Sequence, residues 1–263
     1  MRPTVTLTSD FGLRDSYVAE MKAVILSINP NTNIVDISHD IEKFDIKMAA
    51  YTLACATPYF PKGTIHVAVV DPGVGTRRRA ILVQTQNVFY VGPDNGILTL
   101  ATGNQEIQHI FKITNTKLML TKTSHTFHGR DIFAPAAAHL TNGTKPKEFG
   151  PEIKRISTRT FATISTKNNT LTGEVLHIDG FGNIITNIRQ ENLNSTAIKG
   201  TVNIKTRNLK LRLKLGKTYA DAKKKEAIAV IGSHGFLEVS VNQGNAQTTF
   251  KAKRGDKITL SKA

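Results

Sequence analysis

The chain has 263 residues, 40% of them hydrophobic and 21% charged, a composition that can bury a core and excludes a disordered or collagen-like chain. Lysine and arginine number 35 against 20 acidic residues, so the formal net charge is +15 and nucleic-acid binding has to be weighed. No apolar run reaches the roughly 18 residues of a membrane span, and the single cysteine, Cys55, excludes an internal disulfide, so we expect a soluble, cytoplasmic protein of one or two domains.

The first half of the chain alternates short apolar runs with segments of helical periodicity. Strands are predicted at residues 5–8, 34–37 and 65–70, and helices at 18–28 and 46–55. An alternation of strands and helices predicts a parallel sheet with right-handed crossovers. The apolar third strand is typical of parallel strands that are covered on both faces.

Shorter elements follow before the pattern breaks. Strands are predicted at residues 80–84 and 88–91, and a helix at 133–140 whose Pro135 can sit in its first turn. Residues 141–157 contain Asn-Gly, Lys-Pro-Lys and Gly-Pro, a composition typical of a linker.

The second half has short β-type runs separated by turn residues. These runs are residues 171–178, 184–188, 202–204, 209–215, 228–231, 237–241 and 258–260. They predict an antiparallel sheet or a small barrel. We therefore expect an N-terminal, mostly parallel α/β sandwich domain at residues 1–155, followed by a smaller C-terminal antiparallel β-barrel domain at residues 165–263.

The densest basic segment is residues 205–225, which contains the alternation Lys-Leu-Arg-Leu-Lys-Leu from Lys210. Such period-two alternation is typical of a strand with one wet face and one buried face. We therefore interpret this charge as a solvated strand face in preference to a nucleic-acid site.

Two acidic residues directly follow predicted parallel strands. Asp10 follows the first strand, and Asp71 follows the third at the start of Asp-Pro-Gly-Val-Gly-Thr-Arg-Arg-Arg. Ligands of open parallel sheets bind outside the carboxyl ends of the strands. Asp10 could equally be a turn former, whereas the three arginines that follow Asp71 favour a site there. The sequence Gly-Val-Gly lacks the other residues of a phosphate-binding loop and indicates a tight backbone turn.

A second polar cluster is His-Thr-Phe-His-Gly-Arg-Asp at residues 125–131. Histidine is the side chain that changes protonation near neutral pH, which favours a site, although a solvated loop has the same composition. Metal binding is disfavoured, because no motif completes a ligand set with His125 and His128.

The second half adds two polar turns. In residues 177–187, Phe181 stands between two glycines and is flanked by Asp179 and Asn183. An aromatic ring in this setting can stack on a flat ligand whose edge the polar groups bind, but a β-bulge or hairpin gives the same pattern. Residues 232–238, Gly-Ser-His-Gly-Phe-Leu-Glu, predict another turn.

Together these segments resemble one family, the S-adenosyl-L-methionine (SAM) hydrolases (adenosine-forming), or SAM hydroxide adenosyltransferases, which are related to fluorinase and chlorinase. The resemblance follows the chain in order over nearly its whole length. The strings Asp-Pro-Gly-Val-Gly-Thr from Asp71 and Thr-Phe-His-Gly-Arg-Asp from Thr126 are specific in combination. The resemblance implies that water attacks the ribose C5′ of SAM and releases adenosine and L-methionine, with no cofactor and no metal.

The resemblance also implies a catalytic Asp71, Arg78 and His128. Arg78 is chosen by its spacing from the aspartate, and Arg77 and Arg79 remain alternatives. Displacement of a neutral thioether by water requires an oriented water and a proton acceptor. Asp71 and His128 are both candidates for that acceptor.

Substrate-binding residues are implied in the same way. Asp10 is expected on the ribose hydroxyls, and the methionine part is expected to meet Asp15, Asp179, Ser233 and His234. The adenine and its surroundings are expected to meet Phe181, Asn183 and Tyr219, and the backbone near Val241, Asn242 and Gln243 is expected at the adenine edge. Thr126 and Glu238, in the matching motifs, complete the expected set. His234 departs from the family pattern, in which an arginine or an aromatic residue is expected.

Two departures from the halogenating relatives favour hydrolysis. Those relatives carry a tyrosine where this chain has Asp71, and the fluorinating ones carry a hydroxyl side chain where it has Gly129. A SAM-dependent halogenase and a nucleic-acid-binding protein with a degenerate nucleoside pocket remain the alternatives. The resemblance further implies a homotrimer with sites between subunits, a small-molecule substrate and no membrane partner.

Overall fold

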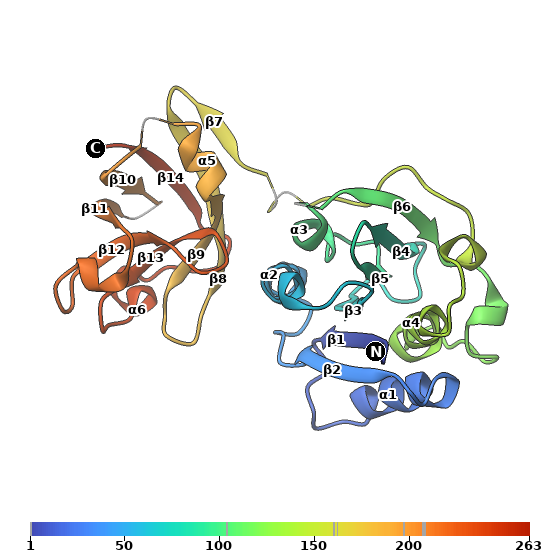
Figure 1. The fold of residues 1–263 in the computed structure, drawn as a ribbon. Helices are drawn as coiled ribbons and strands as arrows, with labels where there is room; N and C mark the ends of the chain where they lie inside the picture. Colours follow the sequence, from blue (N-terminus) through green and yellow to red (C-terminus); the bar gives the residue numbers. More distant parts are fainter. Residues whose placement is uncertain (1, 104, 160, 162, 197, 207–208) are drawn as a thin grey trace. The chain divides into compact units, whose positions relative to one another are not determined.

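The computed structural model describes residues 2–263 apart from 104, 160, 162, 197, 207 and 208. The chain divides into two compact units, Met1–Arg159 and Thr160–Ala263, which are drawn in Figure 1. Among the described residues, no helix is long and apolar enough to cross a membrane.

The first unit is built on a six-stranded sheet with the order β2-β1-β3-β5-β4-β6. Its strands are β1 (Thr4–Ser9), β2 (Asn33–Ser38), β3 (Ile65–Val69), β4 (Ala80–Thr85), β5 (Phe89–Pro93) and β6 (Ile107–Lys112). Strands β2, β1, β3 and β5 are parallel, and β4 is antiparallel to both of its neighbours. This arrangement confirms the predicted mostly parallel α/β domain.

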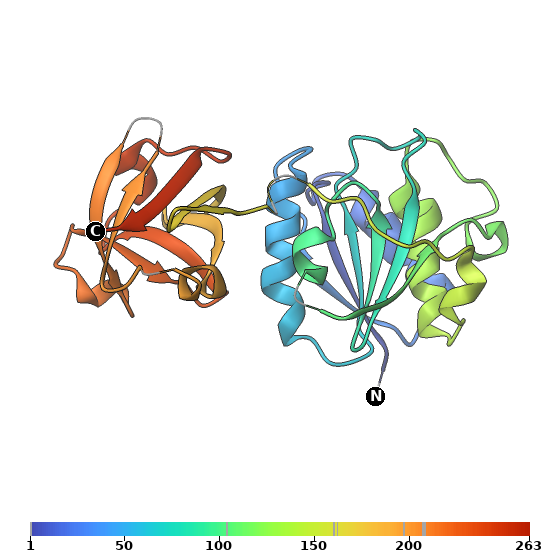
Figure 2. The same cartoon turned by 90° about the horizontal axis from the view of Figure 1, so that it is seen from above.

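Helices cover both faces of this sheet (Figures 1 and 2). Helices α1 (Tyr17–Ile28) and α4 (Ala134–Thr141) pack on one face, and α2 (Ile46–Ala56) and α3 (Thr99–Thr102) pack on the other. Successive strand residues point to opposite faces, so Val67 joins the core under α1 and α4 while Ala68 joins the core under α2 and α3. A strand buried on both faces has to be apolar throughout, as β3 is.

The order of the strands creates a switch point beside β1. The chain passes from β1 through α1 to β2 on one side, and then through α2 to β3 on the other side of β1. Crossovers that leave in opposite directions open a crevice at the carboxyl ends of the two strands, where open α/β sheets bind ligands. This topology places the residues after Ser9 and Val69 at one crevice.

The segment predicted as a linker, residues 141–157, belongs instead to the first unit. The backbone N–H of Lys112 donates to the carbonyl of Pro151 at 2.9 Å, and the N–H of Ile153 donates to the carbonyl of Ile110 at 2.8 Å. Gly143 follows the end of α4, Pro146 begins a short 3-10 helix, and Gly150 and Pro151 lead into the segment that pairs with β6. The prediction was wrong because turn composition does not reveal backbone pairing.

The second unit is a β-barrel. Its strands are β7 (Ser165–Lys167), β8 (Thr170–Ile178), β9 (Ile184–Arg189), β10 (Thr201–Lys205), β11 (Lys210–Gly216), β12 (Ala227–Ile231), β13 (Phe236–Val241) and β14 (Lys257–Lys262). Pairing between β14 and β8 closes the sheet of strands β8 to β14, and β7 is added to β8. Strands β11 and β12 are parallel, while the other pairs are antiparallel. The predicted barrel is confirmed, with this one parallel pair. Short helices α5 (Gln190–Asn194) and α6 (Ala246–Phe250) flank it.

Candidate active site

A cavity of about 330 Å³ lies at the carboxyl ends of β1 and β3, at the switch point of the first unit. Its lining combines acidic, basic and aromatic side chains: Asp10, Phe11, Tyr17, Lys43, Phe44, Val69, Asp71, Val74, Thr126, Phe127, His128 and Gly129. Four of the residues expected from the sequence, Asp10, Asp71, Thr126 and His128, therefore share one cavity.

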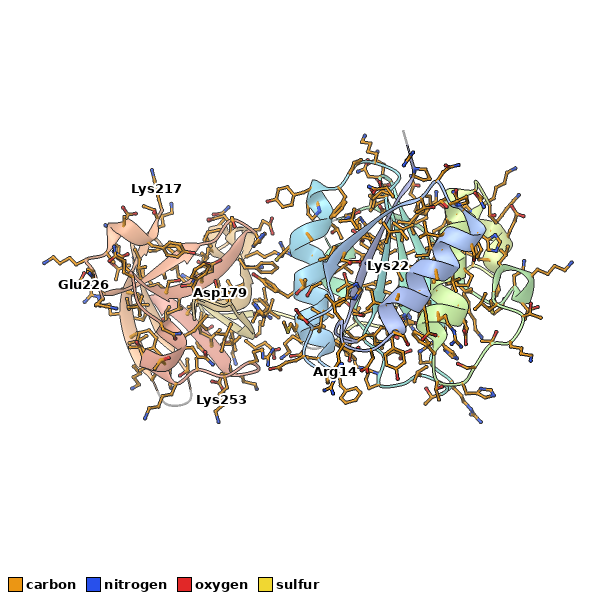
Figure 3. All side chains as sticks on the ribbon, turned by 90° about the horizontal axis from the view of Figure 1, so that it is seen from below. Arg14, Lys22, Asp179, Lys217, Glu226 and Lys253 are labelled. Atoms are coloured by element: carbon orange, nitrogen blue, oxygen red, sulfur yellow. The ribbon has the colours of Figure 1, made fainter. Side chains whose placement is uncertain are left out.

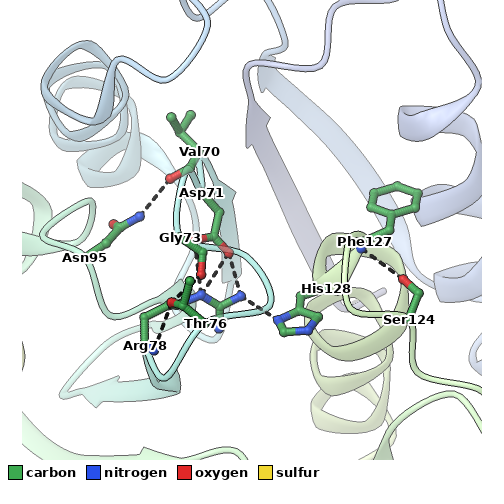
Figure 4. A network of polar contacts seen from close by, with 9 residues as sticks. All are labelled: Val70, Asp71, Gly73, Thr76, Arg78, Asn95, Ser124, Phe127 and His128. Carbon is green, nitrogen blue, oxygen red and sulfur yellow. Dashed lines mark hydrogen bonds and ion pairs between the residues drawn. The ribbon is translucent and has the colours of Figure 1, made fainter.

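Asp71 is held by a forked contact with Arg78 (Figure 4). The Nε–H of Arg78 donates to Asp71 Oδ1 at 3.1 Å and to Oδ2 at 2.8 Å, and its Nη2 donates to Oδ2 at 2.5 Å. The side chain of Asp71 is only 5% exposed, and that of Arg78 is 10% exposed. A planar guanidinium matches a carboxylate in this bidentate geometry, so the position of the Asp71 carboxylate is fixed.

The same guanidinium also contacts His128, with 2.6 Å between Arg78 Nη2 and His128 Nδ1. Because a guanidinium can only donate, Nδ1 accepts this hydrogen bond and a neutral imidazole carries its proton on Nε2. Burial, and then the charge of Arg78, lower the pKa of His128 below its ordinary value of 6.5. His128 is thus neutral at pH 7, in one defined tautomer.

The loop between Asp71 and Arg78 is closed by its own hydrogen bonds. Thr76 donates through both its N–H and its Oγ1 to the carbonyl of Gly73, at 3.2 and 2.7 Å. Gly75 has a φ of +76°, and a Cβ there would lie 2.5 Å from the carbonyl oxygen of His125. A residue with a side chain would be strained at this position, which agrees with the expected tight turn.

The three consecutive arginines have different environments. Arg77 is exposed, and Arg79 donates through Nε to Asp94 Oδ2 at 2.6 Å. Asp94 in turn accepts from the backbone N–H of Ser157 at 2.6 Å. Arg79 and Asp94 therefore hold the last residues of the first unit in place. Of the three arginines, only Arg78 has a described hydrogen bond with Asp71 or His128.

We expect Arg78→Gln to lower kcat/KM by about a hundredfold or more, because the carboxylate and the imidazole lose the group that positions both. Arg77→Gln removes the same charge from an exposed neighbour and is expected to change kcat/KM by less than about twofold. Steady-state kinetics of the two purified variants test this difference. Equal losses in both variants would show that the net charge of the loop, and not this contact, matters.

His128 stands at the entrance of a short π-helix, Gly129–Phe133, which leads into α4. Arg130 donates through Nε to Asp131 at 2.6 Å and through Nη1 to Glu20 of α1 at 2.8 Å. The carboxylate of Asp131 also accepts from the N–H of Ser124 at 2.7 Å. These charged residues therefore hold the segment from Ser124 in place, and π-helical turns of this kind are frequent at functional sites.

Asp10 is tied to a turn that the sequence did not single out. Its Oδ2 accepts from the backbone N–H of Phe44 at 2.9 Å, and its carbonyl oxygen accepts from Lys43 Nζ. Phe44 has a φ of +66° and an exposed side chain. No local sequence signal marks a non-glycine residue in this conformation, so Lys43 and Phe44 could not be predicted as cavity residues.

Aromatic rings form another wall of the cavity. The centroids of Phe11, Tyr17 and Phe127 lie 5.1 to 5.6 Å apart, and Phe127 meets both partners edge to face. Thr126, next to this cluster, lines the cavity, whereas Asp15 is exposed and is not among the lining residues.

In the second unit, Asp179 organises the turn between β8 and β9. Its Oδ1 accepts from the N–H of Phe181 at 2.9 Å and from the N–H of Asn183 at 2.8 Å, and its Oδ2 accepts from Asn183 Nδ2 at 2.9 Å. The ring of Phe181 is 80% exposed. The hairpin interpretation of this segment is therefore correct, and the ring is presented at its tip, available to a ligand.

Tyr219 and Glu238 form a second polar pair, with 2.7 Å between the tyrosine hydroxyl and Glu238 Oε2. Burial raises the pKa of Glu238, and the charge of Asp179 adds to the rise, while Tyr219 and His234 oppose it. Burial and the contact with Glu238 likewise raise the pKa of Tyr219.

The remaining expected residues of the second unit lie at both ends of β13. Ser233 and His234 are exposed in the turn before this strand. Val241 ends the strand and is buried, and Asn242 donates through Nδ2 to the carbonyl of Ala222 at 2.8 Å. The backbone of Asn242 is engaged as well, since its N–H donates to the carbonyl of Glu226 at 2.9 Å and its carbonyl accepts from the N–H of Lys225 at 2.8 Å. Asn242 therefore serves the fold through its amide and its backbone.

No cluster of three or more histidine, cysteine or acidic side chains that could hold a metal ion occurs among the residues that the structure describes. Lone Cys55 is half-buried in α2.

Two family models match the chain. Residues 5–150 match the SAM hydroxide adenosyltransferase N-terminal domain, and residues 173–259 match the SAM hydroxide adenosyltransferase C-terminal domain. The chain belongs to the SAM hydroxide adenosyltransferase family. The resemblance inferred from the motifs is thereby confirmed.

Curated relatives match nearly the whole length of the chain. An (R)-S-adenosyl-L-methionine hydrolase of Thermus thermophilus is 39% identical, covering 99% of this chain and all of that protein. One from Methanocaldococcus jannaschii is 37% identical and covers 97% of this chain and 95% of its own length. A fluorinase of an Actinoplanes species is 27% identical over 99% of this chain and 98% of its own. The hydrolases among these relatives are the more similar ones.

Solved structures of similar proteins share the fold of this chain. A Thermotoga maritima protein superposes with a TM-score of 0.89 at 35% identity, covering 98% of this chain and all of that one. A Thermus thermophilus protein gives a TM-score of 0.79 at 38% identity, covering 99% of this chain and all of that one.

Proposed function

We propose that this protein hydrolyses S-adenosyl-L-methionine to adenosine and L-methionine. The observation that carries the proposal is the linked Asp71, Arg78 and His128 beside a cavity at the switch point of the sheet, in a chain of the SAM hydroxide adenosyltransferase family.

The reaction requires little beyond positioning. A water oxygen bonds to the ribose C5′ as the bond from C5′ to the sulfonium sulfur breaks, and the sulfur keeps the electron pair and leaves as the neutral thioether of methionine. The attacking water loses one proton. The site must therefore orient a water molecule, which is catalysis by positioning, and accept its proton, which is general base catalysis.

The hydrogen-bonding pattern assigns the orientation of water and the acceptance of its proton to different residues. In the neutral tautomer described above, Nδ1 of His128 is occupied by Arg78, so the imidazole offers only the N–H of Nε2 and can orient a water oxygen as a donor. Asp71 has carboxylate lone pairs beyond those that face Arg78 and can accept the proton. We therefore assign Asp71 as the proton acceptor, His128 as the group that orients water, and Arg78 as the group that positions both.

The surroundings of Gly129 support hydrolysis over halogenation. A Cβ at this position would lie 3.1 Å from a ring carbon of Phe127 and 3.2 Å from the sulfur of Met21. A hydroxyl side chain at 129 would therefore have to displace these neighbours, and Asp71 supplies a carboxylate where an incoming halide would meet negative charge.

The two domains are expected to contact different parts of the substrate. The domain at residues 1–155 supplies the catalytic residues and Asp10 for the ribose hydroxyls. The domain at residues 165–263 supplies contacts to methionine and adenine from Asp179, Phe181, Asn183, Tyr219, Ser233, His234, Glu238, Val241 and Asn242. SAM carries two positive charges, on its sulfonium and its ammonium group. The carboxylates of Asp10, Asp15 and Asp179 would attract these charges, whereas the excess lysines and arginines of the chain would repel them.

We further propose a homotrimer in which residues of neighbouring subunits complete each site. We also propose a cytoplasmic location, because a single cysteine forms no internal disulfide and is compatible with a reducing compartment. The family resemblance carries the trimer. Sedimentation of the active enzyme tests it, and a fully active monomer would contradict it.

The activity is tested by incubating the purified protein with SAM and separating the products by chromatography. We expect adenosine and methionine in equal amounts, with and without added chloride or fluoride. Absence of adenosine would overturn the proposal, and a halide-dependent 5′-halo-5′-deoxyadenosine would replace it with halogenation. Because the names of the hydrolases specify the (R) form, both sulfonium epimers are compared, and we expect the (R) epimer to be consumed faster.

The lowered pKa of His128 predicts the acid limb of the activity. Protonation of Nδ1 would turn two donors toward each other and break the contact with Arg78, so activity should persist below pH 6.5 and be lost only as the pH falls through the lowered pKa of His128. In Arg78→Gln, the loss of the neighbouring charge should raise this pKa toward 6.5. NMR titration of His128 in both proteins measures the shift, and an unchanged pKa would contradict the assignment.

A further inference from the structure

The basic surplus of the chain is concentrated in the barrel. Residues 160–263 contain 17 of the 35 basic residues and 7 of the 20 acidic ones, a formal net charge of +10. Figure 3 shows the side chains of Lys217 and Lys253 projecting outward from this unit. The candidate active site does not account for this charge, because the expected substrate is itself a cation.

Three of these cations gather on the outer face of β10 and β11. Lys205 and Lys210 are directly opposite each other in the antiparallel pair, and Arg212, on the same face two residues along β11, is opposite Asn203. All three cationic side chains are exposed, whereas Leu213, the next residue of β11, is buried in the core of the barrel. We call Lys205, Lys210 and Arg212 the basic face.

The usual structural reasons for such lysines do not apply to the basic face. Like charges directly opposite each other in a sheet are destabilising. Lysines protect exposed sheet edges, but β10 lies between β14 and β11, and β11 lies between β10 and β12 (Figure 1). Among the described residues, none of the three side chains makes an ion pair or a hydrogen bond. The repulsion is therefore uncompensated within the described structure, and an anion would relieve it.

The basic face lines a shallow groove of about 520 Å³ whose composition indicates the kind of anion. The other polar lining residues are Thr170, Asn203, Thr259 and Ser261, and the described part of the lining contains no acidic and no aromatic residue. Lysine, arginine, hydroxyl and amide side chains are the groups that contact the phosphates of nucleic acids. Without an aromatic ring there is no platform on which an unpaired base could stack.

We propose that the basic face binds the phosphate backbone of a double-stranded nucleic acid, without sequence preference. This function is separate from hydrolysis, since no residue of the basic face belongs to the candidate active site. Binding of this kind is driven by counterion release and weakens steeply as salt rises.

The test compares two variants of equal charge. Lys205→Gln/Lys210→Gln/Arg212→Gln removes the basic face, and Lys62→Gln/Lys117→Gln/Lys147→Gln removes three exposed charges from the first unit. Fluorescence anisotropy of labelled duplex DNA and duplex RNA, from about 50 to 200 mM salt, gives affinity and salt dependence. We expect the basic-face variant to lose at least about tenfold in affinity and to flatten the salt slope by about 2 to 3. The control should stay within about threefold of the unmodified protein.

Each variant should hydrolyse SAM at the native rate, and its melting temperature should not fall, which confirms that it is folded. The melting temperature of the basic-face variant should rise slightly, because the repulsion between Lys205 and Lys210 is removed. Equal weakening by the two variants would show that bulk charge alone attracts the duplex and would overturn the proposal. Failure of the unmodified protein to bind either duplex at low salt would also overturn it. So would tighter binding to anionic phosphatidylserine vesicles than to the duplexes, because the groove would then serve a membrane surface.

Discussion

Asp71→Asn is expected to lower kcat/KM for SAM by about a thousandfold, within the range that loss of a general base produces. Asparagine keeps the size of the side chain but cannot accept the proton of the attacking water. Its amide N–H groups would also face the guanidinium of Arg78, which contacts both carboxylate oxygens in the native protein. The predicted loss is in kcat, because Asp71 acts on water more than on the bound substrate.

A matched control separates chemistry from folding. Asp94 is also a nearly buried carboxylate paired with an arginine of the same loop, with a side chain that is 2% exposed, but it does not line the cavity. Asp94→Asn should lower the melting temperature while keeping kcat within about tenfold. If Asp71→Asn folds and turns over SAM at a rate close to that of the native protein, Asp71 is not the proton acceptor.

His66 should make the stability of the fold depend strongly on pH. This side chain is completely buried on β3, its Nδ1 lies 2.8 Å from Thr6 Oγ1, and its Nε2 has no hydrogen-bond partner among the described residues. The rings of Phe60 and Tyr90 pack against it. Burial lowers the pKa of His66 to about 3 from an ordinary value of 6.5.

The sign of the effect follows from the lowered pKa. Above pH 6.5 the imidazole is neutral in both folded and unfolded chains, so its contribution is fully present. Between pH 6.5 and about 3 only the unfolded chain takes up the proton, so stability falls as the pH falls. Between pH 7 and pH 4 this amounts to roughly 3 kcal/mol of the free energy of unfolding.

Urea denaturation at a series of pH values measures this loss. The His66→Gln variant keeps a neutral polar side chain and should show a shallower decline, because the unfolded chain then has one histidine fewer to protonate in preference to the folded chain. If that variant does not fold, NMR titration of His66 in the native protein still decides the matter. A pKa near 6.5 in the folded chain, or equal slopes for both proteins, would contradict the expectation.

Much of the fold could be predicted because burial patterns are local. Each of the seven β-type runs of the second half coincides with a strand from β8 to β14, since alternating or apolar runs reflect which side of a strand is wet. Strand β6 was not predicted, because its first three residues, from Ile107, are exposed and only Ile110 and Phe111 are buried. The short helix α3 has too few turns to show a periodicity.

The candidate site could be predicted only in part. Asp10 and Asp71 stand out because parallel strands end at the same edge of a sheet. The choice among the three arginines depends on side-chain directions, and these separate Arg78 from Arg79 only in three dimensions. Spacing from Asp71 favoured Arg78 but left Arg77 and Arg79 open as alternatives.

The central claim is that water displaces methionine from the C5′ carbon of SAM. The most direct test is turnover in water labelled with the heavy oxygen isotope, followed by mass spectrometry of both products. We predict one heavy oxygen in the 5′-hydroxyl of adenosine and none in methionine. Adenosine without the label, or no adenosine at all, would contradict the account.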